Sequence, residues 1–277
     1  MSDQQTKSGF ADVNGAKLYY EIAGAGQAFV MIHAGVADSR QWNSEFAHFA
    51  SRYQVIRFDM RGYGKSEPVE GEFNILDDLV ALLDTLNINT PVLIMGCSMG
   101  GGLAIDFALA HPDRTRAIIL VGSGPSGLEL DAEEPEEQFK KAEEAYLAGN
   151  LELAAEIETQ IWFDGQERSA RQINPAMRKL AYEMNLQALA HDSKKLGKHV
   201  RKEGQPAVER LNELSMPVLV IVGLNDIPYL RMAAEYMQAH LATMKKVEIA
   251  NAAHLPNMDQ PEEFQQAVDA FLTDHSL

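Results

Sequence analysis

The sequence predicts an α/β fold, in which a mostly parallel central sheet carries helices on both faces. Short β-branched runs alternate with longer helical patterns in the first and last parts of the chain, which is typical of such a sheet. Between residues 128 and 214 the pattern indicates three or four helices and no convincing strand. We therefore expect one α/β core, residues 1–123 and 216–277, and a helical insertion, residues 124–215.

Each element of the first part has a local signal. The dipeptide Asn14-Gly15 separates two alternating runs and is a typical two-residue turn, so it predicts a β-hairpin that joins residues 10–13 to 17–22. Further along, short apolar runs indicate buried strands, and apolar residues three and four positions apart indicate helices. The expected strands are residues 29–32, 54–59, 91–95 and 117–121, and the expected helices are 41–51, 73–86 and one that contains 103–110.

Helix-boundary residues divide the insertion. Pro135 is expected to open one helix and Gly149 to end it, because proline suits the first helical turn and glycine the residue after the last. An apolar stripe over 153–161 predicts a second helix, and Asn174-Pro175 predicts the cap and first residue of a third. The remaining elements are a loop-rich return over 193–205, strands at 217–222 and 246–249, and helices at 229–241 and 261–272.

Composition excludes several classes of function. Lysine and arginine total 24 against 40 for aspartate and glutamate, a formal charge of −16, and such a surface repels nucleic acids and anionic membranes. Cys97 is the single cysteine, so a disulfide framework and a cysteine-rich metal cluster are excluded. The polar N-terminus lacks the apolar stretch of a secretory signal. We expect a cytoplasmic protein that binds neither nucleic acid nor membrane and uses no metal or other cofactor; the sequence leaves its oligomeric state open.

The sharpest local signal is Gly96-Cys97-Ser98-Met99-Gly100, which follows a predicted strand and precedes a predicted helix. In that context G-x-S-x-G is typical of a nucleophile elbow, a tight turn that lifts the serine hydroxyl clear of the sheet. Side chains at positions 96 and 100 would hold the strand and helix backbones apart. Ser98 is therefore the candidate nucleophile, and the alternative is a glycine-rich turn that only packs tightly.

A serine nucleophile needs a general base, normally a histidine held by a carboxylate. His254 lies just beyond the last predicted strand, at the sheet edge where α/β proteins place their sites. Asp226 follows another strand at the same edge and is the candidate acid. Its main rival, Asp259, precedes Gln-Pro-Glu and is interpreted as a helix N-cap. Ser98, Asp226 and His254 then follow the chain order Ser…Asp…His.

An oxyanion that forms on an attacked carbonyl is stabilised by two backbone N–H donors. One donor is expected from Met99, the residue after the nucleophile. The other is expected from the loop that follows the strand at 29–32, at Gly35, with Val36 as the alternative.

These motifs, in this order, resemble the α/β-hydrolase superfamily over nearly the whole chain. The matching segments are residues 33–35 with Trp42 downstream, 58–66, 96–102, 110–114, 223–226 and 253–254. The chain looks most like the branch of capped esterases, C–C hydrolases and enol-lactonases, which implies that the insertion forms a lid over the nucleophile. Ala34 stands where the family usually has glycine. Ser98 argues against the dehalogenase and epoxide-hydrolase relatives, whose nucleophile is aspartate.

The substrate pocket has weaker candidates. Apolar and aromatic side chains of the insertion and of the first loop are expected to line it, and packing within the insertion explains the same residue types equally well. These candidates are Val36, Trp162, Phe163, Tyr182 and Met184.

Together these features predict a cofactor-independent serine hydrolase that cleaves small carboxylic esters through an acyl-enzyme on Ser98. A C–C bond hydrolase or an enol-lactonase with the same three residues is the first alternative. A ligand receptor on the same scaffold, without catalysis or with a single turnover, is the second, because a fold alone does not fix function. In each case the partner is a small molecule, an ester or a related carbonyl compound.

Overall fold

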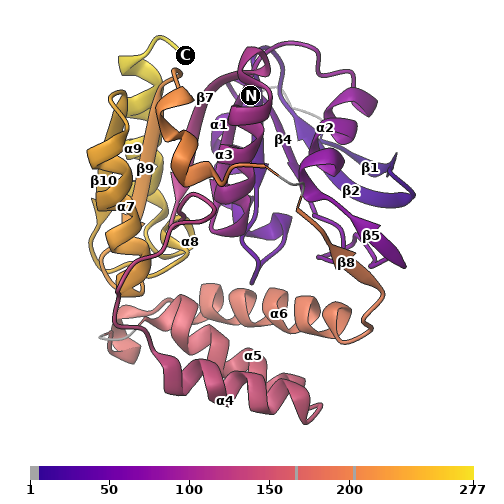
Figure 1. Cartoon of the computed structure of the whole chain (residues 1–277), viewed down its shortest axis with the longest axis vertical. Coiled ribbons are helices and arrows are strands. Elements are labelled where there is room, and N and C mark those ends of the chain that lie inside the picture. The colour runs from indigo at the N-terminus through magenta and orange to yellow at the C-terminus, as the bar shows by residue number, and fades with distance from the viewer. Residues whose placement is uncertain (1–5, 166–167, 202–203) are drawn as a thin grey trace.

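The computed structural model describes residues 6–165, 168–201 and 204–277. At its centre is an eight-stranded sheet in the order β1-β2-β4-β3-β6-β7-β9-β10 (Figure 1). β2 is antiparallel to β1 and β4, and the other neighbouring pairs are parallel, so the mostly parallel sheet is confirmed. The strands are β1 (Lys7–Val13), β2 (Ala16–Ala23), β3 (Ala28–Ile32), β4 (Gln54–Phe58), β6 (Val92–Cys97), β7 (Thr115–Val121), β9 (Val218–Gly223) and β10 (Met244–Ile249).

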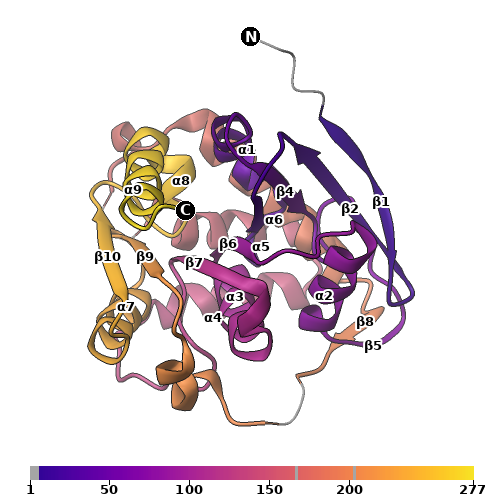
Figure 2. The same ribbon diagram turned by 90° about the horizontal axis from the view of Figure 1, so that it is seen from above.

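Helices cover both faces of this sheet, as the view from above makes clear (Figure 2). On one face lie α2 (Ile75–Thr85), α3 (Met99–Ala110) and α7 (Pro228–His240). On the other lie α1 (Asn43–Phe49), the short α8 (Pro256–Asp259) and α9 (Pro261–Asp274).

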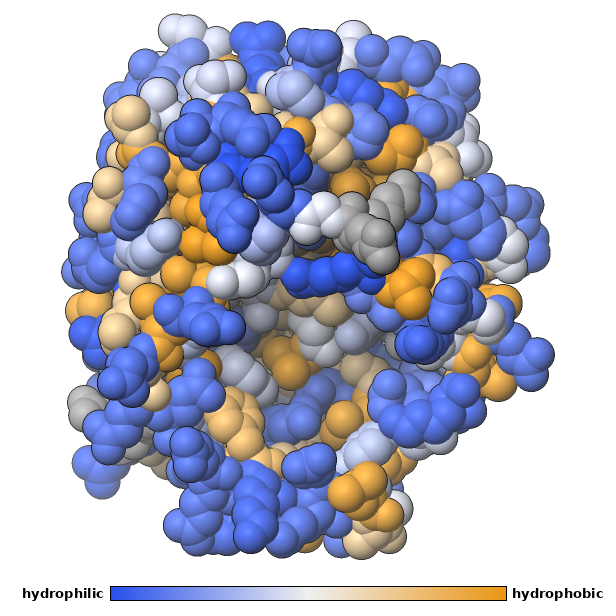
Figure 3. Space-filling view, in the orientation of Figure 1, coloured by the Kyte–Doolittle hydropathy of each residue, from blue (hydrophilic) through white to orange (hydrophobic). Residues whose placement is uncertain are grey.

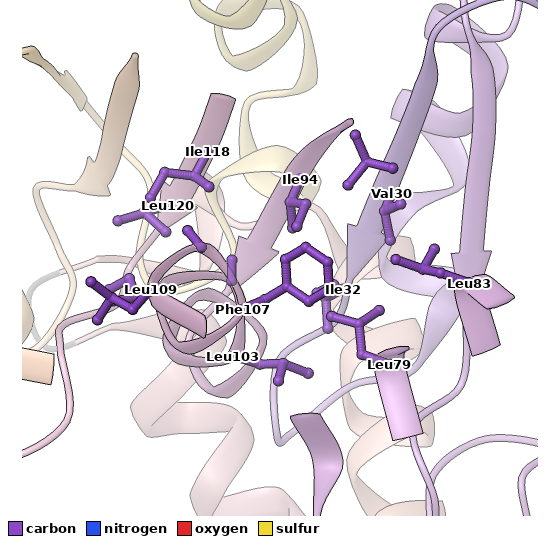
Figure 4. Close-up of a cluster of buried hydrophobic side chains, with 14 of the residues drawn as sticks. Val30, Ile32, Leu79, Leu83, Ile94, Leu103, Phe107, Leu109, Ile118 and Leu120 are labelled. Carbon is purple, nitrogen blue, oxygen red and sulfur yellow. The ribbon is translucent and has the colours of Figure 1, made fainter. Parts of the chain in front are cut away.

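The side chains of β3 show how the two layers are filled. Val30 and Ile32 belong to the cluster beneath α2 and α3, where Phe107 packs between the sheet and Leu79 (Figure 4). Phe29 and Met31 point to the opposite cluster, with α1 and α9. Because successive strand residues face opposite sides and both sides are covered, the strand is apolar throughout. This explains why the short apolar runs of the sequence predicted strands correctly.

Local signals set several element boundaries as expected. Asn14 and Gly15 have φ values of 44° and 81°, the conformation that a two-residue hairpin turn requires. The side chain of Asn174 accepts hydrogen bonds from the amides of Ala176 and Met177 at the start of α6 (Pro175–Asp192). Gly149, after α4 (Glu136–Leu147), has a φ of 78°, which favours glycine after a helix.

The segment between β7 and β9 contains α4, α5 (Leu151–Thr159), a π-helical turn (Gln160–Asp164) and α6. Figure 1 shows α4, α5 and α6 as a separate layer below one edge of the sheet. Short 3-10 turns complete the segment at Ala170–Gln172 and Ala207–Glu213.

Two predictions in this part of the fold are wrong in detail. The return path contains a strand, β8 (Gly197–His199), which pairs in parallel with β5 (Gly71–Phe73). All three β8 residues are exposed, so the strand has no apolar alternation by which it could be found. Phe73 belongs to β5, and the helix expected from residue 73 begins at Ile75, after an N-cap at Asn74.

Over the described residues, the helices are too short or too polar to cross a membrane.

Candidate active site

Ser98 lies in a sharp turn between β6 and α3. Its φ and ψ are 52° and −115°, a backbone conformation that residues with a side chain rarely adopt. The turn is held from both sides, since the Ser98 amide donates to the carbonyl of Val121 (2.8 Å) and its carbonyl accepts from the amide of Gly102 (2.9 Å). The predicted strand–turn–helix context of Ser98 is therefore confirmed.

The glycines around Ser98 are required by close backbone approach. A Cβ at Gly96 would lie 2.1 Å from the carbonyl oxygen of Gly100, and a Cβ at Gly100 would lie 2.5 Å from that of Ile32. A Cβ at Gly101 would lie 2.2 Å from Ser123 Oγ. A side chain at position 96 or 100 would therefore displace the turn, whereas one at position 101 would require the Ser123 side chain to move.

His254 and Asp226 form a buried hydrogen-bonded pair. The Nδ1 atom of His254 lies 2.9 Å from Oδ2 of Asp226, and the two residues are 1% and 4% exposed. The other carboxylate oxygen of Asp226 accepts from the amide of Ile227 (2.8 Å). With Nδ1 donating to the carboxylate, the ring is fixed in one orientation and Nε2 points away from Asp226.

The carboxyl ends of β6, β9 and β10 bring this pair close to the segment that carries Ser98. Asp226 follows β9, and His254 lies between β10 and α8. The thiol of Cys97 donates to the carbonyl of His254 over 3.6 Å. A Cβ at Gly122, just after β7, would lie 3.0 Å from both Asp226 Oδ2 and His254 Nδ1. The pair therefore lies beside the residue that precedes Ser98, at the carboxyl edge of the parallel strands.

Cys97 is fully buried. Burial raises the pKa of its thiol to about 12, because the thiolate is poorly solvated there. The thiol is therefore protonated at neutral pH, which agrees with the side chain packing inward beside the nucleophile.

The loop at residues 33–37, called the oxyanion loop below, lies beside Met99. Its amide at Ala37 donates to the carbonyl of Ala34 (3.1 Å), so Gly35 and Val36 are the central residues of a turn. A Cβ at Gly35 would lie 3.8 Å from Met99 Cβ. The segments of the two predicted oxyanion donors are thus in contact, while their role in catalysis stays a prediction.

His33 fixes the start of this loop, because both of its ring nitrogens bind backbone groups. Its Nε2 accepts from the amide of Met60 (3.0 Å), and Nδ1 lies 2.7 Å from the carbonyl oxygen of Ala34. Nδ1 must therefore carry the proton and donate to Ala34. The ring is fully buried, and burial lowers its pKa, which keeps this imidazole neutral.

The five predicted pocket residues have different surroundings. The ring of Trp162 lies 4.6 Å from that of His254, and its carbonyl accepts from the His254 amide (3.0 Å). Phe163 and Met184 are buried in the apolar cluster on the α1 and α9 side of the sheet. Val36 packs against the same cluster. Tyr182 is half-buried. Their part in binding a substrate stays a prediction.

The space between the sheet and the α4–α6 layer is hollowed, as Figure 3 shows. A cavity of about 190 Å³ lies between the loop after β4 and the end of α6, and Tyr63 and His191 are among its lining residues. The ring of Tyr63 lies 5.0 Å from that of His33, and its hydroxyl lies 3.9 Å from the sulfur of Met99. Tyr63 thus separates this cavity from the oxyanion loop.

Asp259 is not the helix N-cap that the sequence suggested. It ends α8, and Gln260 occupies the N-cap position of α9. One carboxylate oxygen pairs with Arg168 at 3.0 Å, with both side chains at most 1% exposed, and the other accepts from the Ala253 amide (3.1 Å). Asp259 therefore braces the loop that carries His254. Arg168 could not be predicted as its partner, because the two residues are far apart along the chain.

Another buried carboxyl group, that of Glu45, lies near the start of α1. Its two oxygens accept from the side-chain amides of Asn257 (3.0 Å) and Gln265 (3.1 Å). Burial raises the pKa of Glu45 to about 7, although these hydrogen bonds and the charge of Arg57 oppose the shift. The sequence analysis did not single out this group, since nothing in the local pattern marks its full burial.

Glu45→Gln is expected to stabilise the protein at alkaline pH. Between about pH 4.5 and 7 the folded chain binds more protons at Glu45 than the unfolded chain does, so wild-type stability falls as the pH rises through this window. The uncharged variant lacks this slope. The free energy of unfolding of the variant relative to the wild type should rise by roughly 2–3 kcal/mol from pH 5 to pH 8.

Urea unfolding of both proteins at pH 5 and pH 8 measures this difference. Glu143→Gln, on the exposed side of α4, is the matched control. Its effect on the free energy of unfolding should be small and the same at both pH values. A Glu45→Gln advantage that does not change with pH would contradict the assignment.

Residues 27–261 match the family model for the alpha/beta hydrolase fold, and the chain belongs to this family of hydrolases. Among curated proteins it is 28% identical over 250 residues to 3-oxoadipate enol-lactonase 1 of Acinetobacter baylyi, covering 88% of each chain. It is 27% identical over 264 residues to the pimeloyl-[acyl-carrier protein] methyl ester esterase of Nitrosomonas europaea, covering 92% of this chain and 99% of the relative. Among solved structures, a thermophilic esterase from Thermogutta terrifontis superimposes with a TM-score of 0.77 at 24% identity, covering 97% and 99% of the two chains.

Proposed function

We propose that this hydrolase cleaves small carboxylic esters through an acyl-enzyme on Ser98. The observation that carries the proposal is the buried His254–Asp226 hydrogen bond of 2.9 Å beside the segment of Ser98. A carboxylate on Nδ1 leaves Nε2 as the basic nitrogen, which is the arrangement that a serine nucleophile needs.

The first half of the reaction forms the acyl-enzyme. Nε2 of His254 removes the proton from Ser98 Oγ as this oxygen attacks the carbonyl carbon of the ester. The resulting oxyanion accepts hydrogen bonds from the amides of Met99 and Gly35. When the tetrahedral intermediate collapses, the C–O bond to the alcohol breaks, and the leaving oxygen takes the proton from His254.

The second half releases the acid. Water gives a proton to His254, and its oxygen attacks the acyl carbon. The bond to Ser98 Oγ then breaks, the proton returns from His254 to the serine, and the carboxylic acid leaves. Asp226 stays ionised throughout and stabilises the imidazolium that forms twice in the cycle.

In this proposal residues 124–215 form a lid over the site. The contact of Trp162 with the ring and amide of His254 supports it, because this side chain comes from the insertion. The hollow between the α4–α6 layer and the sheet would receive the substrate.

Hydrolysis of an enol lactone by the same three residues is the second candidate. The 28% identity to an enol-lactonase over 88% of the chain favours it. The chemistry at Ser98 is the same, except that the leaving enol oxygen remains attached to the acyl chain. C–C bond hydrolysis of a vinylogous diketone would use the same residues, with a carbon leaving group.

A substrate panel tests these candidates. Short-chain aryl esters, an enol lactone and a vinylogous diketone are assayed with the wild type and with Ser98→Ala, and the intact wild type is treated with a fluorophosphonate. Aryl-ester turnover that is lost in the variant, with one adduct on Ser98, supports the esterase. Faster turnover of the lactone than of the aryl esters would instead support an enol-lactonase. Faster turnover of the diketone would support a C–C hydrolase. Tight binding of a panel compound without turnover supports a receptor and contradicts the enzyme.

A further inference from the structure

A buried hydrogen-bond chain joins three segments of the candidate site, and Gln41 is at its centre. Gln41 lies in the 3-10 turn Ser39–Trp42, just before α1, and is 2% exposed. Its Oε1 accepts from the backbone amide of Ala34 over 2.9 Å. This bond fixes the residue that precedes Gly35, the predicted oxyanion donor.

The same side chain reaches the nucleophile segment. The side-chain amide of Gln41 lowers the pKa of the Cys97 thiol, against the larger effect of burial, and that thiol donates to the carbonyl of His254. Gln41 thus binds the residue that precedes Gly35 and influences the thiol of the residue that precedes Ser98.

Asn257 anchors Gln41 from the other side. Its Nδ2 donates to the backbone carbonyl of Gln41 (2.8 Å) and to Glu45 (3.0 Å), and its Oδ1 lies 3.4 Å from Gln41 Nε2. Asn257 is 1% exposed and lies three residues after His254, in α8. Hydrogen bonds of Gln41, Asn257 and Cys97, all buried, therefore link the loops of the predicted base, nucleophile and oxyanion donor.

We propose that Gln41 is a positioning residue that, anchored by Asn257, holds the oxyanion loop in register with Ser98 and His254. This inference rests on the proposed function. The physical reason is that backbone donors stabilise an oxyanion only when they are fixed in place before it forms. The loop itself contains Gly35 at the centre of a turn, and a glycine adds backbone freedom that an outside contact must restrict.

Gln41→Met tests the proposal, since methionine has a similar length and forms neither of the two hydrogen bonds of the Gln41 side chain. We expect kcat for an aryl ester to fall by about ten- to a hundredfold, with KM changed little, because the lost stabilisation belongs to the transition state. The inhibition constant of phenylboronic acid, which forms a tetrahedral adduct on a catalytic serine, should rise by a similar factor.

Thr115→Val is the matched control. Thr115 is also buried, and its hydroxyl forms one hydrogen bond, to the carbonyl of His111 (3.0 Å), at the start of β7 and thus at the opposite edge of the sheet. It should lower the melting temperature without changing kcat or the boronate constant.

Asn257→Leu keeps the Gln41–Ala34 bond and removes its anchor, so it should show a smaller effect of the same kind. The double variant should be no worse than Gln41→Met, because residues that act through one chain of contacts are not additive. If Gln41→Met does not fold, Asn257→Leu alone is compared with the control.

Two results would overturn the inference. One is a Gln41→Met variant whose kcat and boronate affinity lie within about twofold of those of the Thr115→Val control. The other is a Gln41→Met variant in which kcat falls and the boronate affinity does not change. Failure of the proposed function is a separate outcome, because it appears as a wild type without aryl-ester turnover or as turnover that Ser98→Ala retains.

Discussion

Replacement of Ser98 by alanine is expected to lower aryl-ester turnover by roughly four to six orders of magnitude. The substitution removes the only atom proposed to bond the acyl group, and the remaining rate would come from the oxyanion donors and substrate binding. Alanine keeps the Cβ that the turn already accommodates, so the fold should be unaffected. Initial rates and fluorophosphonate labelling of the folded variant measure the effect.

Ser51→Ala is the control for this substitution. Ser51 is an exposed serine whose hydroxyl donates to the carbonyl of His48 (3.1 Å), and its loss should leave both the rate and the labelling unchanged. Full activity in Ser98→Ala would remove the basis of the proposed mechanism.

Asp226→Asn is expected to lower kcat by about three to four orders of magnitude, through the tautomer of His254. The carboxylate accepts a hydrogen bond at each oxygen, from Ile227 and from His254. An asparagine that keeps the first bond presents its NH₂ group to Nδ1. The imidazole must then accept there and carry its proton on Nε2, where it can no longer take the proton of Ser98.

The chain offers a close control for this experiment. Asp269 also pairs with a histidine, since its Oδ2 lies 2.8 Å from Nε2 of His48, on the partly exposed surface between α9 and α1. Asp269→Asn makes the same chemical change away from the site and should keep the wild-type kcat. If the two variants had equal activities, Asp226 would have no role in orienting His254.

How far the sequence predicted this site depends on how local each contact is. The elbow at Ser98 was predictable because strand, glycines and helix are consecutive in the chain. The approach of His254 to Asp226 was predictable because parallel strands end at a common edge. Both inferences needed only element order and the nature of the residues at the strand ends.

Contacts between segments that are distant along the chain were not predicted from the sequence. The pair of Arg168 with Asp259 joins the insertion to the His254 loop, and no spacing rule relates the two residues. The same holds for Gln41 and Asn257, whose amide groups look like ordinary polar surface residues in the sequence and are buried in the fold. The pairing of β5 with β8 was missed because three exposed residues carry no burial pattern.

The buried pair of Arg168 and Asp259 limits how the segment between β7 and β9 can move. Arg168 also donates to the carbonyls of Asn251 (2.6 Å) and Asp164 (2.8 Å), so its guanidinium is held by both the insertion and the core. Separating a buried ion pair leaves an unpaired charge in the protein interior, which raises the free energy by about 3–5 kcal/mol. We therefore expect this end of the segment to stay bound to the loop of His254, whatever motion the α4–α6 layer makes.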